Sequence, residues 1–168
     1  MTDQPDPAWL RILLQAHKSG GALFSGSSGG KATFTKAELG GHLSGATSVD
    51  EAVFRLRYLG QHGEVDRIFD ALLKKADRLM DTPDFAAVHC GDCVSRLAAL
   101  VVAEETLPIR DQTDSYRARF MGITRGKWRH RYDKPHARLK AQLDIWAGNA
   151  VGAIRRNLYR ISEVAPEK

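Results

Sequence analysis

Apolar residues recur at steps of three and four along two long stretches of the chain. Between residues 64 and 80 the series comprises Val65, Ile68, Phe69, Leu72, Leu73, Ala76, Leu79 and Met80. Between residues 135 and 161 it comprises Leu139, Leu143, Trp146, Ala150, Ile154, Leu158 and Ile161. This spacing follows the turn of an amphipathic α-helix, whereas the alternation typical of β-strands is rare here. The sequence therefore predicts an all-α fold.

Helix start signals divide the first part of the chain into further helices. Thr35 with Glu38, and Ser48 with Glu51, form capping-box pairs in which an oxygen acceptor precedes a carboxylate by three residues. Thr82 before a proline is a third start signal. The predicted helices cover residues 9–17, 36–43, 49–59, 64–80 and 82–105. We interpret the first three as plain scaffold in preference to a small DNA-binding unit.

A glycine- and serine-rich segment, GGALFSGSSGGK, occupies residues 20–31. Its composition predicts a mobile loop. A phosphate-binding loop would require a glycine at Ser25 and a hydroxyl at Ala32, which would ligate magnesium. The sequence therefore speaks against nucleotide binding at this segment.

Charge is distributed unevenly along the chain. Residues 1–108 contain 11 Lys and Arg against 14 Asp and Glu, a net charge of −3, whereas residues 109–168 contain 14 against 6, a net charge of +8. Such asymmetry is typical of a chain with a polyanionic partner, of which nucleic acid is the first candidate. We therefore predict a helical body over residues 1–106, followed by a basic region over residues 107–168.

The basic region has the pattern of a helix-turn-helix closed by a long amphipathic helix from about Pro135. A first helix is predicted to end at Met121, and Gly122 then allows the positive φ of a tight turn. The small residue Ala118 lets the two helices approach each other. Thr124 caps the second helix, and Trp128 supplies a large aromatic side chain beneath it.

With Trp128 directed inward, the polar side chains of the second helix must project outward, as in a recognition helix that enters the DNA major groove. Arg125 and Arg129 lie one turn apart, and we predict that both contact bases. Amides near Thr124 could hold a phosphate. The further predicted nucleic-acid-binding residues, most of them phosphate contacts, are Arg117, Arg119, Lys127, His130, Arg131, Lys134 and Arg138.

The run MGITRGKWRHRYDKPHARLKAQLDIWAGNAVGAIRRNL resembles the carboxy-terminal part of phage late-gene antitermination proteins of the Q type. The resemblance covers residues 92–158 and depends on Gly122, Ile123, Thr124, Arg125 and Trp128. It implies a phage or prophage transcription regulator that binds double-stranded DNA near a late promoter. It also implies that the protein engages paused bacterial RNA polymerase with its sigma factor and carries it past terminators. Some members of the family hold zinc.

The two cysteines, Cys90 and Cys93, form a CxxC pair that could supply half of a zinc site. A second pair is missing, so the remaining ligands would have to be His89 and a distant histidine such as His42 or His62. Both cysteines also fall on the apolar stripe of the predicted helix 82–105, where cysteine behaves as a small hydrophobic residue. We favour this structural role over zinc binding or redox chemistry, and predict no cofactor.

Other functional classes receive less support from the sequence. No combination of nucleophile, base and orienting acid can be assembled, which argues against an enzyme. A mean hydropathy of −0.34 and an acidic amino-terminal segment speak against a membrane span or a signal peptide and favour the cytoplasm. The main alternative to DNA binding is a protein-interaction module that inhibits or adapts a host enzyme. RNA binding is a third interpretation, although the aromatic residues form no stacking platform.

Overall fold

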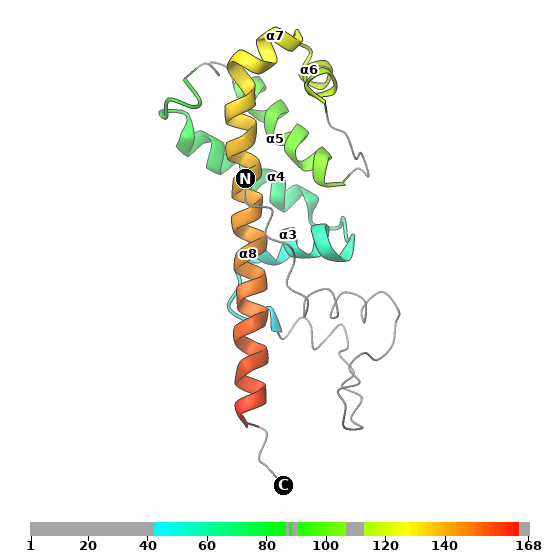
Figure 1. The fold of residues 1–168 in the computed structure, drawn as a ribbon, viewed down its shortest axis with the longest axis vertical. Helices are drawn as coiled ribbons and strands as arrows, with labels where there is room; N and C mark the ends of the chain where they lie inside the picture. Colours follow the sequence, from blue (N-terminus) through cyan, green and yellow to red (C-terminus); the bar gives the residue numbers. More distant parts are fainter. Residues whose placement is uncertain (1–41, 87, 89–90, 107–112, 165–168) are drawn as a thin grey trace. The chain divides into compact units, whose positions relative to one another are not determined.

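A computed structural model describes residues 42–86, 88, 91–106 and 113–164 of the chain (Figure 1). The regular structure in these ranges is helical, and no β-strand occurs within them. The elements are α3 (Ser48–Leu59), α4 (Val65–Leu79), α5 (Gly91–Thr106), α6 (Asp114–Met121), α7 (Arg125–Lys127), the π-helix η1 (Trp128–Tyr132) and α8 (Asp133–Val164). The predicted all-α character is therefore confirmed for this part of the chain. The helix predicted at residues 9–17, all but the last two residues of the helix predicted at 36–43, and the glycine-rich segment 20–31 lie outside the described residues.

The chain divides into two compact units, of which the second is Ser48–Ala147. The described residues of the first unit are 42–47 and 148–164. Within the first unit, the Asn157 side-chain amide donates hydrogen bonds of 2.8 Å to the carbonyl oxygens of His42 and Ser44. The boundary expected between residues 106 and 107 falls inside the second unit, so the change of charge there does not separate the compact units.

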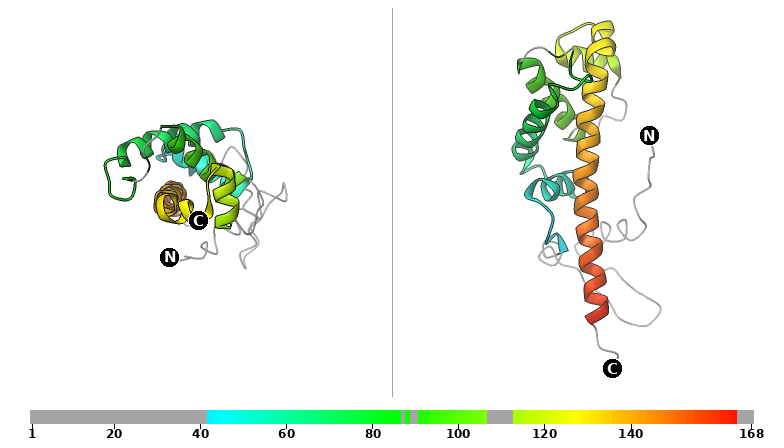
Figure 2. Two further views of the ribbon diagram at one scale, coloured as in Figure 1. Left: turned by 90° about the horizontal axis from the view of Figure 1, so that it is seen from above. Right: turned by 90° about the vertical axis from the view of Figure 1, so that its left-hand side faces the viewer.

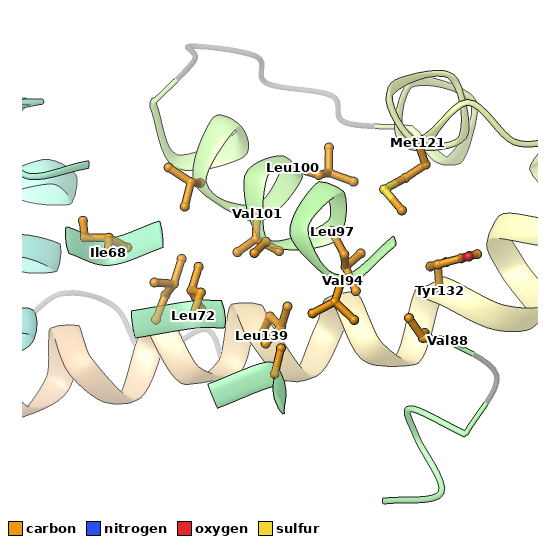
Figure 3. Close-up of a cluster of buried hydrophobic side chains, with 14 of the residues drawn as sticks. Ile68, Leu72, Val88, Val94, Leu97, Leu100, Val101, Met121, Tyr132 and Leu139 are labelled. Atoms are coloured by element: carbon orange, nitrogen blue, oxygen red, sulfur yellow. The ribbon is translucent and has the colours of Figure 1, made fainter. Parts of the chain in front are cut away.

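The second unit is built around one hydrophobic core (Figure 3). In Figures 1 and 2, α3, α4 and α5 lie along one side of the first part of α8, and α6 and α7 lie near its amino-terminal end. On α4, the fully buried residues Ile68, Leu72 and Ala76 belong to the predicted apolar series. The other helices contribute Leu97, Leu100, Val101, Met121, Leu139 and Leu143. No helix among the described residues combines the length and apolar character needed to cross a membrane.

The predicted helix over residues 64–80 is confirmed, but the predicted start of the next helix at Thr82 is wrong. Residues 82–86 form turns, and α5 begins at Gly91. Thr82 closes α4 instead, because its hydroxyl donates to the carbonyl oxygen of Leu79 at 2.6 Å and its backbone N–H donates to the same oxygen at 2.9 Å. The prediction considered only the residues that follow Thr82. In the structure the Thr82 hydroxyl instead binds the end of the preceding helix.

The last helix also differs from its prediction. α8 begins at Asp133, two residues before the expected start, and α7 and η1 run into it without a break. The N–H of Asp133 donates to the carbonyl oxygen of Trp128, five residues earlier. Pro135 has no N–H, and in a regular α-helix its ring would clash with the carbonyl group four residues earlier. The wider turn of the π-helix avoids this clash. The second basic helix and the closing helix therefore form one continuous helical segment.

Candidate nucleic-acid interface

A tight turn joins α6 to the long helical segment. Thr113 caps α6, with its side-chain oxygen accepting a hydrogen bond from the N–H of Tyr116. Gly122 has φ 69° and ψ 32°, and its N–H donates to the carbonyl oxygen of Arg119 at 3.0 Å. The N–H of Ile123 donates to the carbonyl oxygen of Ala118 at 2.9 Å. These two bonds form the Schellman arrangement that ends a helix at a left-handed glycine, so the predicted positive φ of Gly122 is confirmed.

The segment after the turn is held by a cap at its start and an aromatic residue on its inner side. Thr124 accepts a hydrogen bond from the N–H of Lys127 at 3.3 Å. Trp128 is fully buried, as predicted, with its ring centroid 6.3 Å from that of Tyr132 in a stacked arrangement. The ring of His136 meets Trp128 edge-on at 5.4 Å. This packing fixes which side of the helix faces the core and therefore which side faces outward.

Most of the predicted DNA-binding residues lie on the outward side. The predicted residues that are exposed and form no ion pair with any carboxylate of the described residues are Arg119, Arg125, Lys127, Arg131 and Lys134. His130 is exposed as well. Five arginine and lysine side chains, four of them within residues 125–134, are thus exposed and form no ion pair in the part of the chain that the structure describes.

Three predicted contacts are engaged within the protein. Arg129 donates from Nε to Asp114 at 2.6 Å, and Arg138 donates from Nε to Asp84 at 2.7 Å. Arg117 is largely buried and donates from Nε to Glu104 at 2.7 Å. Its position is unsuited to the phosphate contact predicted for it, because the guanidinium is directed into the protein.

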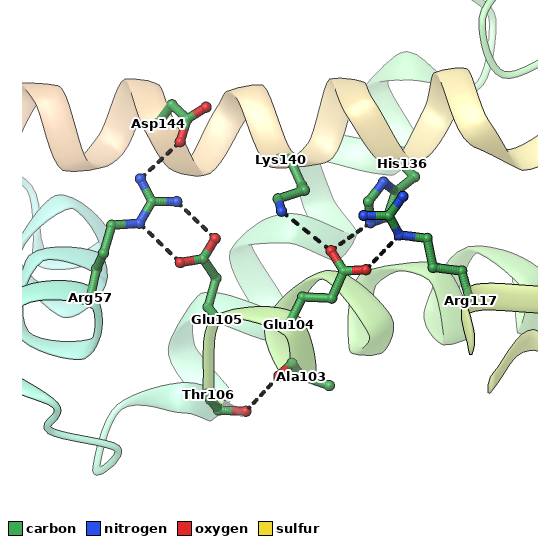
Figure 4. Close-up of polar contacts among 9 residues, drawn as sticks. All are labelled: Arg57, Ala103, Glu104, Glu105, Thr106, Arg117, His136, Lys140 and Asp144. Carbon is green, nitrogen blue, oxygen red and sulfur yellow. Dashed lines mark hydrogen bonds and ion pairs between the residues drawn. The ribbon is translucent and has the colours of Figure 1, made fainter. Parts of the chain in front are cut away.

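Glu104 is the centre of a buried polar cluster that joins α5, α6 and α8 (Figure 4). Its side chain is fully buried and contacts Arg117, His136 Nε2 at 2.9 Å and Lys140 Nζ at 3.4 Å. Burial by itself would raise the pKa of the Glu104 carboxyl, but the hydrogen bonds from His136 and Arg117 lower it to about 2. The cluster therefore holds a carboxylate in the interior and fixes α6 against α5 and α8.

A second polar cluster lies nearby in the same unit. Arg57 of α3 donates bidentately to Glu105 and also to Asp144 of α8 (Figure 4). Although burial opposes the charged form, these carboxylates raise the pKa of Arg57 above its ordinary value. The two clusters position the helices that carry the exposed cations.

One cation near the turn was missed by the sequence analysis. A Cβ atom placed on Gly122 would lie 3.6 Å from Nη1 of Arg96, an exposed residue of α5. Arg96 therefore lies against the turn between α6 and α7 and extends the positive surface. It belongs to the mildly acidic part of the chain and is separated from Gly122 by 26 positions. Only its position on the outer side of a predicted helix could have drawn attention to it.

The structure describes only some of the candidate zinc ligands. Cys93 is half-buried, packs against the hydrophobic core and is disulfide-bonded, so the expected free cysteine is wrong and this sulfur is not available to ligate zinc. Cys90 and His89 lie outside the described residues. Within the described ranges, no group of three or more Cys, His, Asp and Glu side chains is placed to hold a metal ion.

Comparisons with protein families, curated proteins and solved structures find no match to this chain. We therefore infer its function from the arrangement of its side chains. That arrangement combines a helix-ending left-handed turn, a buried tryptophan beneath the next helix, and a surface of exposed cations. Such a surface suits an extended polyanion.

Proposed function

We propose that this protein binds double-stranded DNA and regulates transcription. The observation that carries the proposal is the set of exposed cations on a helix whose inner side is fixed by Trp128; none of them forms an ion pair with a carboxylate that the structure describes. Lysine and arginine side chains that neutralise phosphates release counterions, which drives binding to duplex DNA. Rigid placement of the helix adds the defined geometry that base recognition needs.

The helix pair supports a helix-turn-helix mode of binding. In that mode the amino-terminal residues of the second helix contact base edges in the major groove, while flanking groups hold the backbone. Arg125 is the first residue of α7 and is exposed, so it is our candidate for a base contact. The candidates for phosphate contacts are Arg96, Arg119, Lys127, Arg131 and Lys134. Arg117 is not among them, because its guanidinium is largely buried against Glu104. Arg138 is not among them either, because it lies within α8, beyond the amino-terminal end of the basic helix.

The resemblance of residues 92–158 to Q-type antitermination proteins supports a more specific role. In this proposal the protein acts in the cytoplasm on bacterial RNA polymerase with its sigma factor, without a cofactor. A transcription assay on a template that carries a terminator tests it: the protein should increase readthrough by purified holoenzyme. Unchanged readthrough on templates that the protein binds would remove the antitermination role and leave DNA binding in place.

The DNA-binding proposal is tested by the salt dependence of binding to a short fluorescent duplex. Lys127→Ala combined with Arg131→Ala removes two exposed cations one turn apart, and should reduce the slope of log K against log salt by about 2. The matched control, Lys74→Ala with Arg78→Ala, removes two exposed cations of the same spacing from α4. It should leave the slope within about 0.5 of the unmodified protein.

One result would contradict DNA binding itself, and a second would contradict its assignment to this surface. The first is no measurable affinity for any duplex at about 50 mM salt, where electrostatic binding is strong. The second is an equal loss of slope in both variants, which would mean that overall charge rather than this surface drives association. A dominant protein partner recovered after nuclease treatment, together with the first result, would favour the interaction-module interpretation.

A further inference from the structure

The geometry points to Asp114 as a positioning residue that orients Arg129 for reading a base. This inference rests on the proposed DNA binding and adds a determinant of sequence specificity to it. Asp114 is the first residue of α6, directly after its cap Thr113. Arg129 lies 15 positions later, on the helix that follows the turn.

The ion pair uses only part of the guanidinium group. Nε of Arg129 donates to Oδ2 of Asp114 at 2.6 Å. The two terminal Nη groups have no partner among the described residues, and 55% of the Arg129 side chain is exposed. A carboxylate at Nε fixes the plane of the guanidinium and leaves its outer edge open. That edge carries the two parallel N–H donors that match O6 and N7 of guanine.

The surroundings of Asp114 keep it ionised. The hydrogen bond from Arg129, together with the positive charges of Arg129, Arg125 and Arg117, lowers the pKa of the Asp114 carboxyl. A carboxylate within a phosphate-binding surface repels the DNA backbone, so it costs general affinity. In return it holds Arg129 in one orientation before DNA arrives, and preorganisation of this kind favours the matching base.

The chain contains a second ion pair of the same form, which provides a control. Arg138 donates from Nε to Oδ2 of Asp84 at 2.7 Å, and the exposed fractions of the two side chains are 65% and 28%, against 55% and 25% for Arg129 and Asp114. Arg138 lies nine residues beyond Arg129, about 13 Å further along the helix. It is therefore distant from the amino-terminal end that approaches the bases.

The experiment first selects preferred sequences from a randomised duplex pool with the unmodified protein. Affinities are then measured for a selected duplex and for a scrambled duplex of equal length, and their ratio gives the discrimination. Asp114→Asn should bind the scrambled duplex about twofold or more tightly, while its discrimination falls about fivefold to tenfold. Asp84→Asn should keep the discrimination of the unmodified protein within about twofold.

A double-mutant cycle shows whether Asp114 acts through Arg129. In an Arg129→Ala background, Asp114→Asn should have no further effect on discrimination. Arg129→Lys keeps the positive charge but lacks the two parallel N–H donors of the guanidinium. This variant should therefore retain affinity for the scrambled duplex and lose discrimination. This variant leaves α6 unaltered. If Asp114→Asn fails to fold, the discrimination of Arg129→Lys tests the inference instead.

The inference is overturned if Asp114→Asn, or Arg129→Lys where the former is unfolded, keeps full discrimination. An equal effect of Asp114→Asn with and without the Arg129 side chain would overturn it as well, as would a pool that binds without enrichment of any sequence. In these three cases the protein still binds DNA and the proposed function stands. Failure to bind any duplex would instead remove the proposed function itself.

Discussion

Glu104 Oε2 of α5 and His136 Nε2 of α8 lie 2.9 Å apart in the interior of the second unit. Both side chains are almost completely buried, and Arg117 of α6 binds the other carboxylate oxygen. A carboxylate in this position is stable only while its partners remain. Through Arg117, Glu104 therefore links α6, which precedes the basic helix, to the core of the second unit.

Replacement of Glu104 by glutamine should strongly destabilise the protein, because it leaves Arg117 without its buried counter-charge and removes the carboxylate that is hydrogen-bonded to His136. We expect a loss of about 3 kcal/mol in the free energy of unfolding, measured by urea denaturation. Glu64→Gln, which removes the exposed partner of Arg67, is the control and should cost less than about 0.5 kcal/mol. Equal losses would mean that the buried cluster has no special role in stability.

The same cluster predicts a characteristic acid dependence. The pKa of Glu104 is about 2 in the folded protein, below its ordinary value of 4.5. Its contribution to stability is thus fully present above pH 4.5 and is lost as the pH falls through the folded value. Unfolding free energies measured from neutral pH down to about pH 2 should fall less steeply in Glu104→Gln than in the unmodified protein. Parallel pH curves would contradict this assignment.

Two glycines near the turn should respond in opposite directions to alanine. Gly122 has a φ of 69°, so Gly122→Ala should cost about 1 kcal/mol of stability. Gly126 lies in α7 with open space where a Cβ would stand, so Gly126→Ala should stabilise the protein by up to about 1 kcal/mol. Thermal denaturation of both variants checks this, and a stable Gly122→Ala protein would contradict the role of the left-handed turn.

Trp128 should support both stability and DNA binding. Trp128→Ala removes a fully buried side chain and should cost about 3–5 kcal/mol. Trp128→Phe should cost less than about 2 kcal/mol, because it also removes the indole N–H, which has no hydrogen-bond partner among the described residues. Urea denaturation measures both losses. Duplex affinity should weaken at least tenfold in the alanine variant, although no cation is removed, and unchanged affinity would argue against a fixed recognition helix.

Features that depend on neighbouring residues could be predicted from the sequence. The apolar spacing of residues 64–80 predicts α4, and the predicted helix 49–59 corresponds to α3, which is followed by Gly60 with a φ of 62°. The left-handed Gly122 and the buried Trp128 were also predicted correctly. Each of these depends on the geometry of one or two helical turns, which the local sequence determines through sterics and periodicity.

Features that depend on contacts between distant residues were decided by the tertiary structure. The sequence lists the cations of residues 109–168 but does not show which are neutralised: Arg138 meets Asp84 from 54 positions away. It also does not show that Arg96 lies beside Gly122. The positive charge available to bind a polyanion is the charge that remains after such pairing. Pairing of this kind requires side chains to come within a few ångströms, and only the packing of α5, α6, α8 and the turn segment that contains Asp84 brings them together.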